Sequence, residues 1–237
     1  MTTPAWQYDE MTQIGTDYAS EDEVRQYDER MGRFRDRAAD ADAIMEAIGL
    51  DHDHIVMEIG CGTAEFAIHA SERCERVIAI DISPVMLEYA RTKAAARGRA
   101  NIDFIHAGFL GYKHAGAPLD AIVTELALHH LPDFWKLVAL HRVAGMMRSD
   151  GMLYLKDVVF SLNLEKYEKT LTYAVEDLRK AAGDDTARNF ERHIRQEYST
   201  YDWIMEEMLY RAGFDIIDAA YGDHCLATYL CRKGERR

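Results

Sequence analysis

The segment at residues 56–64, Val-Met-Glu-Ile-Gly-Cys-Gly-Thr-Ala, limits the possible folds of this chain more than any other feature. An apolar run there ends in an acid and a turn with two glycines, and a second apolar run at residues 77–81 ends in Asp81. This order is typical of a βαβ unit that binds a nucleoside at the carboxyl end of its first strand. Glycine suits the turn because it adopts unusual backbone angles and lets a ligand approach closely. We therefore expect Asp81 to accept hydrogen bonds from ribose hydroxyls.

The glycine spacing argues against a nicotinamide dinucleotide. In the dinucleotide pattern G-x-G-x-x-G, counted from Gly60, the third glycine falls on Glu65. A pyrophosphate favours bare backbone N–H groups at a helix N-terminus over two nearby carboxylates. Glu58 suits a ligand that carries an ammonium group, and together these features favour S-adenosylmethionine.

Three later segments extend the pattern in the same order along the chain. They are Leu-Asp-Ala-Ile-Val-Thr-Glu-Leu-Ala-Leu-His-His-Leu-Pro-Asp at 119–133, Ser-Asp-Gly-Met-Leu-Tyr-Leu at 149–155 and Ala-Gly-Phe-Asp-Ile-Ile at 212–217. With the glycine turn, they make the chain resemble the class I S-adenosylmethionine-dependent methyltransferases over residues 54–159 and 200–232. The ending Ala-Leu-His-His-Leu-Pro-Asp is common in the small-molecule branch of that family.

Hydrophobic periodicity and turn residues predict an α/β fold with a doubly wound, mostly parallel sheet of seven strands. Strands are expected at 55–59, 76–81, 101–106, 120–125, 151–159, 214–219 and 224–231. The short connection between the last two strands forces an antiparallel hairpin. Helices are expected at 34–48, 64–73, from Ser83-Pro84 onward, 133–147 and 200–212, with an inserted helical segment at 163–198 that is interrupted near Gly183.

The expected organisation is one core domain with helical additions. Residues 1–50 are interpreted as an N-terminal helical lid, in which Ser20 to Glu23 resemble a capping box. Residues 51–237 form the Rossmann-like methyltransferase domain, with the helical insertion at about 160–198. The N-terminal and inserted helices are expected to form a lid over the ligand site.

Composition narrows the classes of partner. The net charge is −13, with 28 Lys and Arg against 41 Asp and Glu, which opposes binding to nucleic acid. No apolar run reaches the ~18 residues of a membrane span, and the N-terminus lacks a secretory signal. The four cysteines are scattered without Cys-x-x-Cys pairing, so neither a zinc site nor disulfides are expected. We expect a reduced, cytoplasmic protein without metal, membrane or nucleic-acid partner; the oligomeric state stays open.

The resemblance implies a set of cofactor-binding residues. Glu58 and the turn around Cys61 are placed at the methionine end, Asp81 at the ribose, and Ile82 against the adenine. The family's third glycine is Ala64 here, and its usual acid after the third strand is missing, so backbone groups of Gly108 and Phe109 are expected to replace that acid. The full set is Glu58, Gly60, Cys61, Gly62, Asp81, Ile82, Met86, Gly108, Phe109 and Glu125.

Candidate catalytic residues are His129, His130, His193 and Tyr18. His129 and His130 follow the fourth strand, where the transferred methyl group is expected, and histidine titrates near neutral pH. A purely structural role, capping or lining the pocket, stays open for both. His193 lies in the insertion, where the alternative is an exposed helical histidine in a charged stretch.

Two further groups have functional and ordinary interpretations. Tyr8, Tyr18, Tyr198, Tyr201 and Trp203 form either an aromatic lid with cation–π contacts to a sulfonium or simple packing. His52-Asp53-His54 has the spacing of metal ligands, but its place before the first strand favours a solvated loop.

The predicted function is methyl transfer from S-adenosylmethionine to a small-molecule acceptor at oxygen, nitrogen, sulfur or carbon. Thr124 to Ala127 replace the Asn/Asp-Pro-Pro-Tyr/Phe motif of adenine and glutamine methylation, and no Pro-Cys nucleophile is present for cytosine. Two alternatives stay open, namely an RNA or protein methyltransferase and a non-catalytic cofactor-binding protein.

Overall fold

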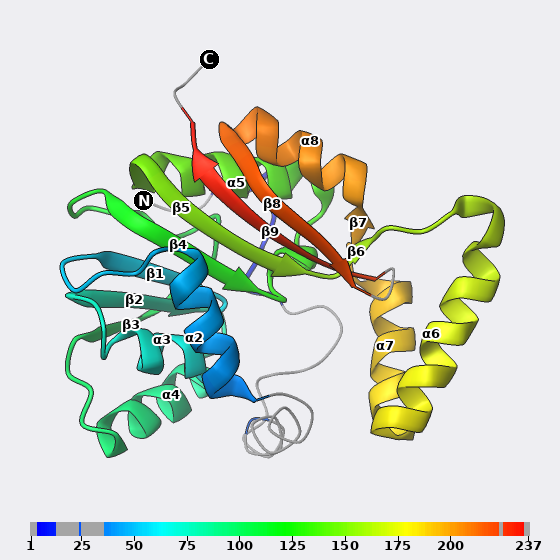
Figure 1. Ribbon diagram of the computed structural model, residues 1–237, viewed down its shortest axis with the longest axis horizontal. Coiled ribbons are helices and arrows are strands. Elements are labelled where there is room, and N and C mark those ends of the chain that lie inside the picture. The colour runs from blue at the N-terminus through cyan, green and yellow to red at the C-terminus, as the bar shows by residue number, and fades with distance from the viewer. Residues whose placement is uncertain (1–3, 13–23, 25–35, 223–224, 235–237) are drawn as a thin grey trace.

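Seven strands form one mixed sheet in the computed structural model, which describes residues 4–12, 24, 36–222 and 225–234 (Figure 1). The strand order is β3-β2-β1-β4-β5-β9-β8. In that order the bounds are Ile102–His106, Arg76–Asp81, Ile55–Ile59, Leu119–Glu125, Met147–Asp157, Leu226–Lys233 and Phe214–Gly222.

Strand direction follows the predicted pattern. β3, β2, β1, β4 and β5 pair in parallel, whereas β9 runs antiparallel to both β5 and β8. The order reverses at β1, whose two neighbours are β2 and β4. Ligands bind at such a switch point outside the carboxyl ends of the strands. The predicted fold class is confirmed.

Both faces of the central strands β1, β2 and β4 are buried, and successive side chains of each strand point to opposite sides. Val56 and Val77 contribute to one core, and their neighbours Met57 and Ile78 to the other. The first core is covered by α2 (Arg37–Ala47), α3 (Glu65–Ala70) and α4 (Pro84–Ala96), and the second by α5 (Asp133–Met146) and α8 (Asp202–Ala212) (Figure 1). Near-continuous apolar strands are therefore required by the packing.

The insertion forms a helical hairpin of α6 (Tyr167–Ala182) and α7 (Asp184–Gln196), which projects from one end of the sheet (Figure 1). The helices meet at Gly183, whose φ of 86° breaks the helical path at the predicted place. A two-stranded parallel sheet of β6 (Val159–Phe160) and β7 (Thr200–Tyr201) brackets the insertion. Short 3-10 helices, η1 (Leu128–His130) and η2 (Leu164–Lys166), precede α5 and α6.

Several predicted boundaries are wrong by a few residues. The strand predicted at 151–159 spans Met147–Asp157, and Val159 belongs to β6 instead. Between the two strands, the Asp157 carboxylate accepts a hydrogen bond from the N–H of Val158 at 2.7 Å. The helix predicted at 64–73 ends at Ala70, and that predicted from 200 begins at Asp202.

The helix start predicted at Ser20 to Glu23 lies outside the described residues. α2 packs into the sheet's first core through Ile44 and Met45, and the division at residue 50 stays a prediction. Among the described residues, no helix has the length and apolarity to cross a membrane.

Candidate active site

The loops after β1 and β4 meet at a cavity of about 370 Å³ at the carboxyl ends of the strands. Gly60, directly after β1, has a φ of +73°, and a Cβ built there would lie 2.5 Å from the Cβ of Ala127. Only glycine therefore allows these two loops to approach so closely.

Asp81 lies at the end of β2 and lines the cavity. Its carboxylate accepts hydrogen bonds from the N–H of Gly62 at 2.7 Å and of Ser83 at 2.8 Å. Burial raises the pKa of Asp81, and these N–H groups oppose the rise. The bonds hold the carboxylate in one orientation beside the glycine turn, as a ribose-binding acid requires.

Glu58 is buried below the turn, and its Oε2 accepts a hydrogen bond from the N–H of Ala67 at 3.0 Å. Burial and the nearby charge of Glu125 raise its pKa well above the ordinary value. Neither Glu58 nor Cys61 is among the residues that line the cavity. Their expected contact with the methionine end stays a prediction.

The expected adenine end of the cavity contains Ile82, Met86, Gly108 and Phe109. Glu10, from the N-terminal segment, also reaches this end and accepts hydrogen bonds from the N–H groups of Leu110 at 2.9 Å and Gly111 at 2.6 Å. Burial raises the pKa of Glu10, and the bonds to backbone oppose the rise. Glu10 therefore brings a carboxylate to the expected adenine end, where the sequence lacks the family's usual acid after the third strand. The sequence contains no signal for it, because a polar segment without periodicity gives no position for Glu10.

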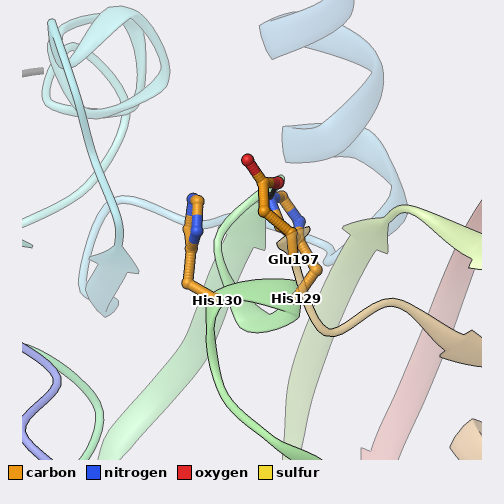
Figure 2. Close-up of side chains that lie close together, drawn as sticks. All are labelled: His129, His130 and Glu197. Atoms are coloured by element: carbon orange, nitrogen blue, oxygen red, sulfur yellow. Dashed lines mark ion pairs between the residues drawn. The ribbon is translucent and has the colours of Figure 1, made fainter. Parts of the chain in front are cut away.

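His129 is the centre of a buried polar network on the opposite wall. It is 5% exposed, and its backbone N–H donates to Asp157 Oδ2 at 3.0 Å. Its Nδ1 pairs with the Asp157 carboxylate, and its Nε2 lies 3.2 Å from Glu197 Oε2 (Figure 2). Burial lowers the pKa of His129, but the two carboxylates outweigh burial and raise it to about 9.

His130 differs from its neighbour although the ring centroids are only 4.3 Å apart. Burial and the charge of His129 lower the pKa of His130 to about 4. Its Nδ1 is buried and finds no hydrogen-bond partner among the described residues. His130 and Glu197 both line the cavity, and their side chains lie close together (Figure 2).

His193 also joins this network, so its interpretation as an exposed histidine is wrong. It is 8% exposed, and its ring centroid lies 4.7 Å from that of His129. Its Nδ1 pairs with Glu197, and its Nε2 lies 2.6 Å from Ser199 Oγ. Sequence reasoning missed Asp157 and Glu197. The spacing of four between His193 and Glu197 on a helix was the one available signal.

The insertion contributes a wall of the cavity through Leu178 of α6 and Thr186, Asn189 and Phe190 of α7. The candidate lid aromatics that the structure describes lie elsewhere, and none lines the cavity. They are Tyr8, Tyr198, Tyr201 and Trp203. The Tyr8 hydroxyl donates to the backbone oxygen of His130 at 3.4 Å, so this ring supports the wall from behind. Tyr18 lies outside the described residues.

The His52 segment is an exposed loop, in agreement with the second interpretation. His52 pairs through Nδ1 with Asp51 at 2.7 Å, and both side chains are largely exposed. Cys61, Cys74, Cys225 and Cys231 are all buried.

Comparisons with known proteins agree with this geometry. Residues 56–151 match the family model of a methyltransferase domain. An uncharacterized methyltransferase of Geobacillus kaustophilus is 28% identical over 191 residues, which cover 81% of this chain and 81% of that protein. Residues 56–151 therefore form a methyltransferase domain, and the likeness to these proteins agrees with the predicted S-adenosylmethionine-dependent methyltransferase activity.

Two solved structures show the same methyltransferase fold. An S-adenosylmethionine-dependent methyltransferase of Clostridium acetobutylicum has a TM-score of 0.66 at 14% identity, over 90% of this chain and 98% of that one. The N-methyltransferase NodS of Bradyrhizobium japonicum, solved with S-adenosyl-L-homocysteine, has a TM-score of 0.59 at 16% identity, over 85% of this chain and 87% of that one.

The residues at the cavity fit the cofactor of this family. The volume of about 370 Å³ is in the range of small-molecule sites. A Cβ built on Gly62 would meet no described residue within 4 Å, so among these residues nothing covers the backbone of the turn there. Asp81 offers a fixed carboxylate beside it.

Proposed function

We propose that this methyltransferase acts on a small-molecule acceptor, which binds between the glycine turn and the wall formed by His129, His130 and Glu197. The observation that carries the proposal is the single cavity that all three residues share with Gly60 and Asp81. The net charge of −13 supports a free metabolite over RNA, because RNA affinity depends on neutralised phosphates.

The cofactor supplies a methyl group on a sulfonium, which is already activated for transfer. We assign the ribose hydroxyls to Asp81 and the adenine to Ile82 and Met86, with the Glu10 carboxylate near the adenine amino group. The methionine end lies against Gly60 and the turn that follows. Glu58, Cys61, Gly62, Gly108, Phe109 and Glu125 complete the proposed set.

The main task of the protein is alignment of the acceptor with the methyl group. Correct positioning contributes roughly 7–11 kcal/mol to lowering a barrier of this kind. α6 and α7 close the acceptor end through Leu178 and Phe190, which limits the access of water. We propose that these helices and the N-terminal segment act as the lid.

The polar wall is proposed to orient and activate the acceptor. His130 presents a ring that is neutral at pH 7, and His129 a ring held by two carboxylates. His193 fixes Glu197 from the far side. For Tyr18 a catalytic role stays a proposal from sequence alone.

The test uses cofactor labelled in its methyl group and a bacterial extract separated into metabolites, RNA and protein. We expect label in the metabolite fraction, at a rate that changes little between low and high salt. Label found only in RNA or only in protein would contradict the proposal and favour the alternative class of acceptor. Cofactor binding without transfer to any fraction would also overturn it.

A further inference from the structure

We propose that His129, His130 and Glu197 together bind a divalent transition-metal ion at the acceptor end of the cavity. One ring nitrogen from each histidine and one carboxylate oxygen lie within 4.8 Å of one another. Ligands about 2.1 Å from a tetrahedral ion lie about 3.4 Å apart. Small side-chain rotations therefore suffice to close the site. Figure 2 shows the three side chains close together, contributed by the segment after β4 and the residue after α7.

The residues around this triad are those that orient metal ligands. The Nδ1 of His129 is bound to Asp157, which leaves Nε2 directed at Glu197. Histidine ligands usually donate their second N–H to a carboxylate or carbonyl in this way. Glu197 is held by His193, which in turn contacts Ser199 Oγ at 2.6 Å. Two of the three proposed ligands are thus held in place by neighbouring side chains, His129 by Asp157 and Glu197 by His193.

A second observation that supports the site concerns the third proposed ligand, His130. The Nδ1 of His130 is buried without a partner among the described residues. A buried polar atom without a partner costs about 1–3 kcal/mol. An ion bound by the His130 ring would compensate for that cost, and it would replace the proton between His129 Nε2 and Glu197.

The donor set indicates the kind of ion. Two imidazoles and one carboxylate with open positions suit iron(II), manganese(II) or zinc(II) rather than calcium or magnesium, which prefer all-oxygen sites. All three residues line the cavity, so the open positions face the acceptor. This inference rests on the proposed function, because an ion here would bind an acceptor through a hydroxyl or carboxylate oxygen. Ligation lowers the pKa of a bound hydroxyl, which would favour acceptors with such a group.

The experiment uses the full chain after treatment with EDTA and titrates it with zinc, manganese and cobalt chlorides. We expect one ion per chain in calorimetry and, for cobalt, a visible absorption band of a low-coordinate site. H130A and E197Q should each weaken binding by at least about 100-fold. H141A, which changes an exposed histidine of α5, is the matched control and should leave binding unchanged. Melting curves of each variant check that it is folded.

Three outcomes would overturn the metal site. They are the absence of stoichiometric binding, binding in H130A or E197Q that is as tight as in the original protein, and loss of binding in H141A. Binding of S-adenosyl-L-homocysteine, measured in the same samples without metal, separates this inference from the proposed function. If the protein binds S-adenosyl-L-homocysteine and transfers methyl groups but binds no metal ion, only the metal site is refuted.

Discussion

At the scale of single residues, the site depends on positions where no other side chain fits. The contact between Gly60 and Ala127 brings the loops after β1 and β4 together, and the carboxylate of Asp81 is fixed by two backbone N–H groups. Each of these features makes a separate prediction, because the first concerns packing and the second concerns charge.

G60A should destabilise the protein by about 2–4 kcal/mol, since it combines a steric clash with a left-handed backbone angle. Adding A127G removes the clash but not the strain, and should recover part of the loss. G49A is the control, because Gly49 has a φ of +61° and a Cβ built there meets none of the described residues within 4 Å. Its cost should be about 1–2 kcal/mol. Urea denaturation measures all four proteins, and equal losses in G60A and G49A would contradict the proposed contact.

D81A should weaken binding of S-adenosyl-L-homocysteine at least about tenfold, because hydrogen bonds to a charged acceptor contribute about 1.5–3 kcal/mol. D81N keeps the shape of the side chain and removes its charge. Its affinity for S-adenosyl-L-homocysteine should lie between that of D81A and that of the original protein. Calorimetry gives both affinities. Unchanged affinity in D81A would refute the ribose assignment.

At the scale of elements, the site is completed by segments outside the sheet. The N-terminal segment brings Glu10 to Leu110 and Gly111, and α7 brings His193 to Glu197. Glu10 and the residues of α7 are both far from the glycine turn in sequence. α3 and α4 are joined in turn by Glu65, which contacts Lys93 at 2.5 Å and Arg97 at 3.2 Å.

E10A should lower the affinity for S-adenosyl-L-homocysteine by about fivefold to tenfold, because the acid near the adenine and the link to Leu110 are both lost. D9A is the neighbouring control, since Asp9 bonds only within its own segment, to the Met11 N–H at 3.1 Å and the Thr12 hydroxyl at 2.7 Å, among the described contacts. Equal effects of E10A and D9A on affinity would show that Glu10 has no specific contact.

The ion pairs of Glu65 predict how stability depends on pH. Burial acts to raise the pKa of Glu65, but the contacts with Lys93 and Arg97 outweigh it and lower the pKa to about 2 from an ordinary value of 4.5. A lowered folded-state pKa stabilises the fold above pH 4.5, and this contribution is lost as the pH falls toward 2.

E65Q should therefore reduce the free energy of unfolding by about 1–2 kcal/mol at pH 7, and the difference should shrink steadily as the pH falls below 5. E88Q on α4 is the control, because Glu88 is 76% exposed and lies 3.6 Å from Arg91. Its effect should stay within about 0.5 kcal/mol. A difference for E65Q that does not change with pH would contradict the ion-pair explanation.

At the scale of the whole molecule, periodicity and turn chemistry predicted the sheet, its two buried faces and its antiparallel end. The glycine turn and Asp81 were predicted correctly as neighbours, since both lie at the ends of adjacent parallel strands. Glu10, Asp157 and Glu197 were not predicted, because their positions depend on how distant segments fold over the site. The end of β5 at Asp157 was also misplaced, because the apolar residues Val158, Val159 and Phe160 follow it directly along the chain.

The short β6 and β7 strands have a consequence for how this enzyme family diversifies. The α6–α7 hairpin begins after β6 and ends before β7, and these two strands pair directly with each other. The two ends of the hairpin are therefore held at fixed positions on the domain. Exchanging the α6–α7 hairpin for that of a relative would alter one wall of the cavity at its proposed acceptor end. The register of the central sheet would stay the same. Natural variation in acceptor choice can therefore accumulate in about forty residues without a cost to the scaffold that holds the cofactor.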